Sequence, residues 1–340
     1  MPRLRRSNPA KPGIKRLPRG RGFTYVDLDG TTVTDPVVRA RIADLVIPPA
    51  WRDVWISPYP NGHIQAIGID AAGRKQYLYH ADWRARRDAL KHDHVLELGR
   101  RLPAARAQVA EDLAGSGLTR RRVLATAARM LDLGFFRVGG ERYAEANGSY
   151  GLATIRREHV HVQRGGLVVF DYPAKSGRQR VQQLTEPAVV EVVRALLRRR
   201  GGGEELLAYY ADRQWRDIRS HDINDYLREI VGAEVSAKDF RTWHGTVLAA
   251  IALAVVEPQG MSPSGRKAAV ARAVREVSEY LGNTPAVCRR SYIDSRVIDH
   301  FESGETISNV LPLLGEEADA GMLASIGAAE RATLQLLSHT

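Results

Sequence analysis

The chain has 340 residues, 44% of them hydrophobic and 26% charged, which indicates a folded protein of about two domains. No apolar run approaches the ~20 residues of a membrane span, and the single cysteine, Cys288, excludes an internal disulfide framework and a cysteine-based zinc site. Fifty Lys and Arg against 39 Asp and Glu give a net charge of +11, which favours a nucleic acid as partner, with an anionic membrane surface second.

The first 22 residues carry eight Lys or Arg side chains and no acidic residue. We expect residues 1–22 to form a flexible basic arm, which either follows the phosphates of a nucleic acid or stays solvated. The segment lacks the apolar stretch of a secretory signal, so we expect none, and the scarcity of cysteine favours a reducing cytoplasm.

Residues 23–90 are predicted to form a small β-rich N-terminal domain, because short strand-like runs alternate there with turn signals such as PNG and AAGR. The segment IGIDAAGRK predicts a hairpin whose return strand carries Arg74, Gln76, Tyr77 and Tyr79. Alternation places the two tyrosines on one face and Gln76 on the other. Basic and amide groups interleaved with aromatic rings suit contacts to phosphates and base edges; the alternative is an ordinary exposed strand.

Residues 91–340 are predicted to form a larger, mainly helical domain with an acidic C-terminal tail. Apolar positions recur there at helical spacing, and residues 186–232 are expected to be helical on both sides of RRRGGGEE. The segment FFRVGGERYAE places Arg137 at the end of one helix and Tyr143 at the start of the next. Residues 302–340 carry six acidic side chains and one Arg, and they include a further helix, ERATLQLL.

Residues 156–184 switch to a period of two, which predicts a short three-stranded antiparallel sheet with turns at RGG and PAKSG. The second turn presents Lys175 at its tip. Taken alone, a lysine in such a place is an ordinary solvated side chain.

A strongly apolar helix is predicted from 238 to 256, with Arg241 in its first turn. A cation there opposes the helix dipole, so an anion bound nearby would explain its presence. Another helix over 264–282 leads into LGNTPAVCRRSYID.

In this last segment Pro285 fits the first turn of a helix, and Thr284 can cap that helix. Tyr292 lies nine positions after Asn283 and about two turns into the helix, a rigid place from which to aim a side chain. The alternative is that Tyr292 is a half-buried aromatic residue of an amphipathic helix.

Five outstanding polar residues come from separate elements, as catalytic groups usually do: Arg137, Lys175, Arg241, Asn283 and Tyr292. Two guanidinium groups can hold the non-bridging oxygens of one phosphate. A tyrosine hydroxyl can attack phosphorus, a lysine can protonate the leaving oxygen, and an amide can donate a hydrogen bond as charge builds. Such a site needs neither a metal ion nor ATP, because guanidinium replaces the cation and a phosphotyrosine bond conserves the energy of the diester.

Five segments resemble, in the right order, those of the type IB DNA topoisomerases, in particular the short poxvirus-like bacterial form. They are RKQYLY (74–79), FFRVGGERY (135–143), YPAKSG (172–177), KDFRTWHGT (238–246) and LGNTPAVCRRSYID (281–294). The first is similar to the DNA-contacting strand of that family. The others are similar to the segments with the first catalytic Arg and a DNA-contacting Tyr, the general-acid Lys, the second Arg and the nucleophile.

The resemblance implies that Tyr292 attacks a DNA phosphodiester, which gives a 3′-phosphotyrosyl link and a free 5′-hydroxyl. Lys175 protonates that leaving oxygen, with Arg137 as a partner in the transfer. The transition state is stabilised by Arg137, Arg241 and Asn283. The nicked supercoiled duplex then swivels and is rejoined, with no cofactor.

The same resemblance implies an α+β protein that closes as a C-shaped clamp on duplex DNA. It would be a monomer associated with the nucleoid. Its implied DNA-binding residues are Arg74, Gln76, Tyr77, Tyr79 and Tyr143.

One position departs from the family. Many relatives carry His where this chain has Asn283, and because Asn cannot exchange protons, only hydrogen-bond donation remains there. Two alternative functions stay open. A tyrosine recombinase usually carries His three residues before the second Arg, where this chain has Lys238. A DNA-binding protein without activity could use the same scaffold, although all five catalytic-type residues are present.

Overall fold

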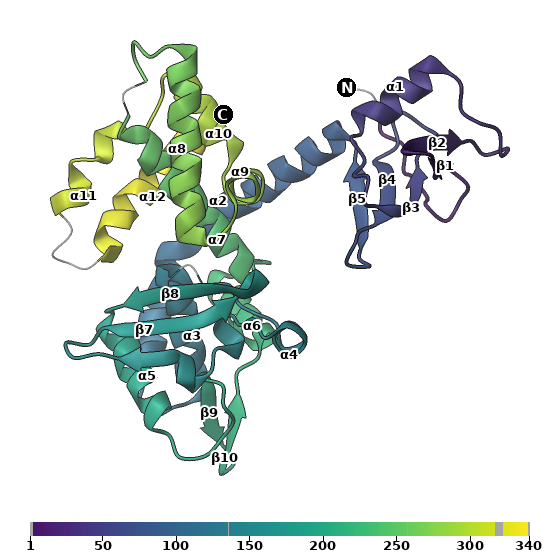
Figure 1. Ribbon diagram of the computed structural model, residues 1–340. Coiled ribbons are helices and arrows are strands. Elements are labelled where there is room, and N and C mark those ends of the chain that lie inside the picture. Colours follow the sequence, from purple (N-terminus) through teal and green to yellow (C-terminus); the bar gives the residue numbers. More distant parts are fainter. Residues whose placement is uncertain (1–2, 135, 257, 317–321, 339–340) are drawn as a thin grey trace. The chain divides into compact units, whose positions relative to one another are not determined.

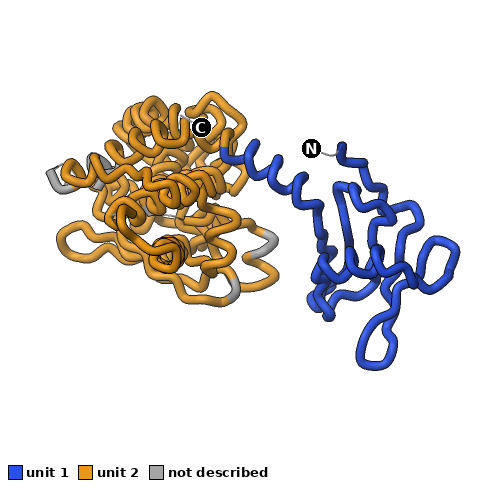
Figure 2. The backbone as a smooth tube through the Cα atoms, turned by 90° about the horizontal axis from the view of Figure 1, so that it is seen from above, with its two compact units in different colours: residues 1–92 blue, residues 93–340 orange. Residues whose placement is uncertain are grey.

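The computed structural model describes residues 3–134, 136–256, 258–316 and 322–338. The chain divides into two compact units, residues 1–92 and 93–340, with the boundary inside helix α2 (Ala81–Leu113) (Figure 2). Each unit has a hydrophobic core of its own, and the described strands pair in antiparallel sheets. No helix in the described residues combines the length and the apolar character that crossing a membrane requires.

The first unit is built on a five-stranded sheet with the order β2-β1-β3-β4-β5 (Figure 1). Its elements are β1 (Ile14–Arg19), β2 (Gly22–Val26), α1 (Pro36–Asp44), β3 (Arg52–Ile56), β4 (Ile64–Ile69) and β5 (Lys75–Tyr79). Its small core contains Ile42 of α1 and Ile56 of β3, so the helix covers the sheet. The sequence predicted strands at β2 to β5.

The prediction that residues 1–22 form a flexible arm is wrong for β1, which pairs with both β2 and β3. Ile14 and Arg16 alternate inward along this strand and are buried. The guanidinium of Arg16 donates to the carbonyl oxygens of Pro48 and Trp51 at 3.1 and 2.6 Å. A charged residue at an inward position broke the hydrophobic alternation, so the strand was not recognised.

The second unit is mainly helical. Besides the last part of α2, its helices are α3 (Arg120–Gly134), α4 (Glu141–Asn147), α5 (Pro187–Arg198), α6 (Ser220–Val231), α7 (Ala237–Ala254), α8 (Pro263–Leu281), α9 (Pro285–Tyr292), α10 (Ser295–Ser303), α11 (Leu313–Glu316) and α12 (Met322–Ser338). Single turns of 3₁₀ helix occur at η1 (Leu152–Thr154), η2 (Arg157–His159), η3 (Lys175–Gly177) and η4 (Ser308–Val310).

The predicted three-stranded sheet is confirmed. It consists of β6 (Val160–Val162), β7 (Val168–Ala174) and β8 (Arg178–Leu184), paired in that order. Val160 lies opposite Phe170, and Tyr172 lies opposite Arg180. The turn between β7 and β8 is η3, which begins at Lys175.

Residues 186–232 are not helical throughout, because they include a hairpin of β9 (Ala208–Ala211) and β10 (Gln214–Asp217). The two residues of its turn, Asp212 and Arg213, have φ angles of 51° and 62°. Such tight turns usually contain Asn or Gly, so this sequence gave no turn signal.

The C-terminal region ends in a packed helix. α12 begins eight residues before the predicted segment ERATLQLL. Ala329, Ala332 and Leu337 on this helix are buried in the same core as α7 and α8. The last part of the predicted acidic tail is therefore an integral element of the second unit.

Candidate active site

Helix α9 carries Tyr292 as its last residue. As predicted, Pro285 is the first residue of the helix and the hydroxyl of Thr284 accepts from the backbone N–H of Val287, at 3.4 Å. A Cβ atom at Gly245 of α7 would lie 2.6 Å from the carbonyl oxygen of Tyr292. The glycine therefore allows α7 and α9 to touch backbone to backbone, which fixes the tyrosine relative to α7.

The carboxyl-terminal end of α8 gathers three arginine side chains from three separate parts of the chain. They are Arg137, Arg180 and Arg241, which donate to the carbonyl oxygens of Gly282, Glu279 and Leu281 at 2.7, 3.1 and 2.7 Å. The last carbonyl groups of a helix have no partner within it and carry the negative end of its dipole. This helix end therefore holds three like charges close together.

Arg137 lies three residues beyond the end of α3, in the segment that leads to α4. Its carbonyl oxygen accepts from the N–H of Leu152 at 2.8 Å. The following Gly139, with φ of 80°, packs so closely on Gly151 that a Cβ on either residue would come within 3 Å of the other's backbone. The pair of glycines thus pins the arginine segment against η1.

Asn283 follows the end of α8 and contacts the same arginine. Arg137 donates to its Oδ1 at 2.6 Å. The Nδ2 of Asn283 is buried and has no hydrogen-bond partner within the described residues. Because an arginine can only donate, it holds the amide with Oδ1 toward itself, which leaves Nδ2 as the donor that the sequence predicted at this position.

A pocket of about 280 Å³ opens beside these groups. The side chains that give it its charge and chemistry are Arg137, Lys175, Lys238, Arg241 and Tyr292. Of the described residues that line it, none is Asp or Glu. Four of the five predicted catalytic residues therefore share one cationic pocket, and the fifth, Asn283, is bonded to one of them.

Arg241 is 3% exposed. Burial, and then the charge of Arg137, lower the pKa of its guanidinium to about 10, while Tyr292 opposes the shift. The guanidinium carbon lies 5.3 Å from the centre of the Tyr292 ring. A phosphate in the pocket would offset the repulsion between the two arginines, so the site is organised for an anion before any anion binds.

Comparisons with known proteins show the family of the chain. Residues 80–306 match the family model of the eukaryotic DNA topoisomerase I catalytic core, and residues 22–70 match that of the bacterial DNA topoisomerase IB N-terminal domain. The chain belongs to the type IB DNA topoisomerases. It is also 28% identical over 299 residues to the DNA topoisomerase 1B of Acanthamoeba polyphaga mimivirus, over 86% of this chain and 88% of that protein.

The topoisomerase pocket includes residues that the sequence analysis did not select. Lys238 lines it together with Arg241. Residues three positions apart lie on the same face of a helix, so helical spacing could have predicted Lys238. Ser149 and Tyr150 also line it. Arg180 reaches the end of α8 from the strand position opposite Tyr172, and no periodic signal in the sequence marks it.

Tyr172, a further tyrosine near these arginines, is a structural residue. Its hydroxyl donates to Oε1 of Gln182 at 2.6 Å. Burial raises its pKa to about 12, although the charges of Arg180, Arg137 and Arg241 oppose the shift. The side chain therefore stays protonated and bonded within the sheet.

The predicted DNA-contact strand is β5, in the first unit. Tyr77 and Tyr79 stack with ring centres 6.0 Å apart, so they share one face as predicted, and Tyr79 stacks on Trp83 of α2 at 4.2 Å. Tyr77 remains 41% exposed. The side chain of Tyr143, on α4, lies outside the described part of the structure.

Gln76 and Arg74 converge on one carboxylate. Asp70 accepts from Nε2 of Gln76 at 2.9 Å and pairs with Arg74 at 2.9 Å. The pKa of Asp70 falls to about 2, first because the backbone N–H of Arg74 donates to it and then because both side chains do. With Nε2 held by Asp70, the amide of Gln76 is fixed in one orientation.

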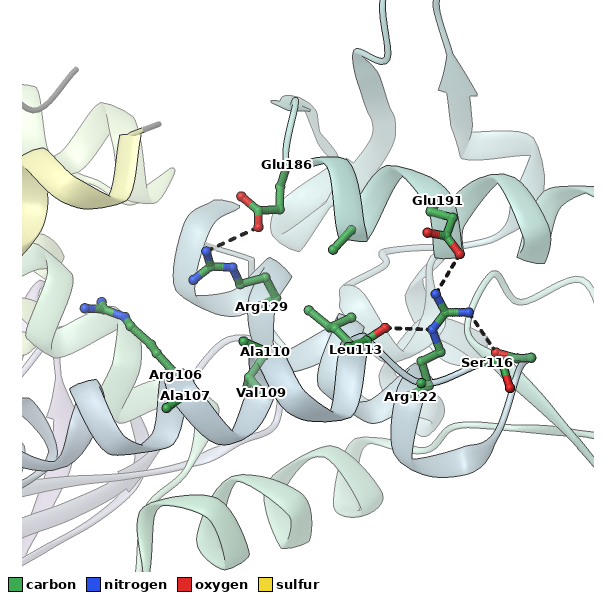
Figure 3. Close-up of a pocket in the computed structure, with 14 residues that line it drawn as sticks. Arg106, Ala107, Val109, Ala110, Leu113, Ser116, Arg122, Arg129, Glu186 and Glu191 are labelled. Atoms are coloured by element: carbon green, nitrogen blue, oxygen red, sulfur yellow. Dashed lines mark hydrogen bonds and ion pairs between the residues drawn. The ribbon is translucent and has the colours of Figure 1, made fainter. Parts of the chain in front are cut away.

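A larger pocket, of about 670 Å³, lies between α2, α3 and α5 (Figure 3). Its arginines face carboxylates: Arg122 pairs with Glu191 at 2.7 Å, and Arg129 pairs with Glu186 at 3.4 Å. This internal neutralisation leaves little attraction for an anion. The smaller, cationic pocket is therefore the candidate active site.

Proposed function

We propose that this type IB topoisomerase relaxes supercoiled duplex DNA through a covalent intermediate on Tyr292. The observation that carries the proposal is the pocket that joins this tyrosine to Arg137, Lys175 and Arg241. The hydroxyl oxygen of Tyr292 attacks phosphorus, and the bond from phosphorus to the 5′-oxygen breaks. The products are a 3′-phosphotyrosyl link and a free 5′-hydroxyl.

Two arginines and an amide stabilise the charge that builds on phosphorus. Arg137 and Arg241 hold the non-bridging oxygens, and their bonds to the end of α8 fix them before DNA arrives. The buried Nδ2 of Asn283 donates the third hydrogen bond. In this role the asparagine needs no proton exchange, which fits its replacement of the family's histidine.

Lys175 supplies the proton for the leaving 5′-oxygen, with Arg137 assisting the transfer. Its place in the exposed turn η3, among the residues that line the pocket, lets it approach from the rim. After cleavage the duplex swivels, and the 5′-hydroxyl reverses the reaction by attacking the phosphotyrosine. The phosphotyrosyl bond conserves the energy of the diester, so the cycle needs neither ATP nor a metal ion.

The protein acts as a monomer on DNA in the nucleoid. We propose that the first unit and the catalytic unit close on the duplex as a C-shaped clamp. The exposed Tyr77 and Arg74 support a DNA-binding role for β5, and a net charge of +11 favours contacts with phosphates. The residues proposed for these contacts are Arg74, Gln76, Tyr77, Tyr79 and Tyr143.

Relaxation of supercoiled plasmid in EDTA and without ATP tests the proposal. We expect the wild-type protein to relax the plasmid, and Tyr292→Phe to lose both relaxation and covalent adduct while it still binds duplex DNA. Tyr210→Phe is the matched control, because this exposed tyrosine of β9 lies outside the pocket. Relaxation by Tyr292→Phe would disprove the proposed chemistry.

A further inference from the structure

Two opposite faces of helix α7 contact different parts of the protein. Arg241 and Gly245 face α8 and α9, where they meet the carbonyl oxygen of Leu281 and the backbone of Tyr292. Trp243 lies about 200° around the helix from Arg241 and is fully buried on the other side. The contacts on the Trp243 face therefore determine how closely the face with Arg241 and Gly245 packs against the backbone of Tyr292.

A buried ionic network holds that second face. Glu330 of α12 accepts from Nε1 of Trp243 at 3.0 Å and from both terminal nitrogens of Arg106 at 2.6 and 2.9 Å. Asp132 of α3 accepts from Arg106 at 2.8 and 2.9 Å and pairs with His244 at 3.2 Å. The network joins α2, α3, α7 and α12, and its two carboxylates are each only 5% exposed.

The indole of Trp243 is also fixed sterically. A Cβ at Gly99 of α2 would lie 2.8 Å from the edge of the ring, so the ring fills the space that this glycine leaves. The ring cannot move toward α2, and its N–H is held by Glu330. Helix α7 is therefore clamped between this network and the backbone of Tyr292.

We propose that Glu330 is a positioning residue for Arg241, and the inference rests on the catalytic role proposed for that arginine. Without the carboxylate, Trp243 and Arg106 lose their shared partner and α7 can shift away from α9. Because Gly245 touches the backbone of Tyr292, such a shift separates Arg241 from the nucleophile. A misplacement of ~1 Å can cost a reaction ~10²-fold. Glu330 lies beyond residue 306, where the match to the catalytic core ends.

Single substitutions in the full-length chain test this role. We expect Glu330→Ala to slow plasmid relaxation at saturating enzyme by about 10-fold to 100-fold, with unchanged affinity for duplex DNA. Glu330→Gln keeps an acceptor for Trp243 and should restore most of the rate. Trp243→Phe keeps the ring but removes the N–H, and should lower the rate by at least about threefold.

Asp112→Ala is the matched control. Asp112 is a buried carboxylate that likewise accepts from an arginine and an aromatic donor, Arg121 at 2.7 Å and Tyr226 at 2.6 Å. It joins α2 to α3 and α6, and among the described residues it forms no hydrogen bond or ion pair with α7. This variant should lower the melting temperature and leave the relaxation rate, measured well below that temperature, within about twofold of the wild type.

A double-mutant cycle separates positioning from mere stabilisation. In an Arg241→Ala background, Glu330→Ala should cause no further loss of rate, because the group that it positions is gone. Additive losses would overturn the proposal, as would a Trp243→Phe protein that is folded and relaxes at the wild-type rate. If Glu330→Ala does not fold, Trp243→Phe and Glu330→Gln decide the question. Failure of the wild type to relax plasmid would instead refute the proposed function itself.

Discussion

Two arginines of the catalytic unit, the half-buried Arg106 and the buried Arg241, have opposite electrostatic surroundings. Burial acts to lower the pKa of Arg106, but the bonds from Asp132 and Glu330 outweigh it and raise that pKa. Burial lowers the pKa of Arg241 as well, and the charge of Arg137 lowers it further, to about 10. The first arginine has its counter-charges in the fold, whereas the second sits beside another cation.

This difference separates a structural cluster from a binding site. The network around Arg106 is complete within the chain, as are the Arg122 and Arg129 pairs of the larger pocket in Figure 3. The pocket around Arg241 gathers positive charge at the end of α8, and none of the described residues that line it is Asp or Glu, so it attracts an anion. We propose that a backbone phosphate of the DNA substrate is that anion.

The largest effect is expected from Lys175, the cation on the pocket's rim. Lys175→Ala should slow cleavage of an ordinary diester by ~10²–10⁴ if the residue is a general acid. A substrate with sulfur at the 5′-bridging position needs little protonation, so it should largely restore the rate. Cleavage of both substrates at equally reduced rates would assign Lys175 an electrostatic role instead.

The two compared arginines should respond to alanine in opposite ways. Arg241→Ala should lower the relaxation rate by about 10²–10³ with little loss of stability, since it removes one of three neighbouring like charges. Arg106→Ala should cost about 3–5 kcal/mol of unfolding free energy, because it leaves the buried Glu330 without its cation and Asp132 with only the more distant Arg129, at 3.5 Å. Relaxation assays measure the loss of rate, and urea unfolding measures the loss of stability. A larger loss of rate in Arg106→Ala together with a larger loss of stability in Arg241→Ala would contradict the comparison.

The loss of folding stability at acidic pH should depend on Asp132. Burial acts to raise its pKa, but hydrogen bonds from His244 and Arg106 outweigh burial and lower it below its ordinary value. Its stabilisation is therefore present above the unfolded pKa of about 3.9 and is lost as pH falls toward the lower folded value. Asp132→Asn should be less stable at pH 7 and should lose less stability than the wild type below about pH 4. Equal slopes would show that the carboxylate does not titrate as described.

The smallest effect is expected on the salt dependence of DNA binding. Lys238→Ala removes one cation that lines the pocket, so it should reduce the slope of log affinity against log salt for a short duplex by about one. Arg120→Ala removes a cation that Asp222 already pairs, at 2.6 Å, and should leave the slope unchanged. Equal changes of this slope in the two variants would show that Lys238 contributes no more to DNA binding than a cation that is already paired.

Local signals in the sequence predicted much of the site. Thr284 and Pro285 mark the start of α9, and the turn at PAKSG places Lys175. These features depend on neighbouring residues, so the pattern contains them. Arg180 and Glu330 could not be predicted in this way, because their roles come from the end of α8 and from Trp243, far away in the chain.

The fold shows the same division. Strands β2 to β5 were recognised, because short strand-like runs alternate there with turn signals. Strand β1 was missed because Arg16 occupies a buried position that backbone carbonyl groups satisfy. The hairpin of β9 and β10 was missed because Asp212 and Arg213 adopt a conformation that is usually left to glycine or asparagine.

Mapping of the covalent adduct tests the central claim most directly. After reaction with plasmid, nuclease digestion and cleavage by trypsin, Tyr292 is the only tyrosine in the peptide of residues 291–296, which follows Arg290 and ends at Arg296. We expect the nucleotide mass on this peptide and a 3′-phosphoryl attachment. An adduct on any other peptide, or attachment through a 5′-phosphate, would contradict the account.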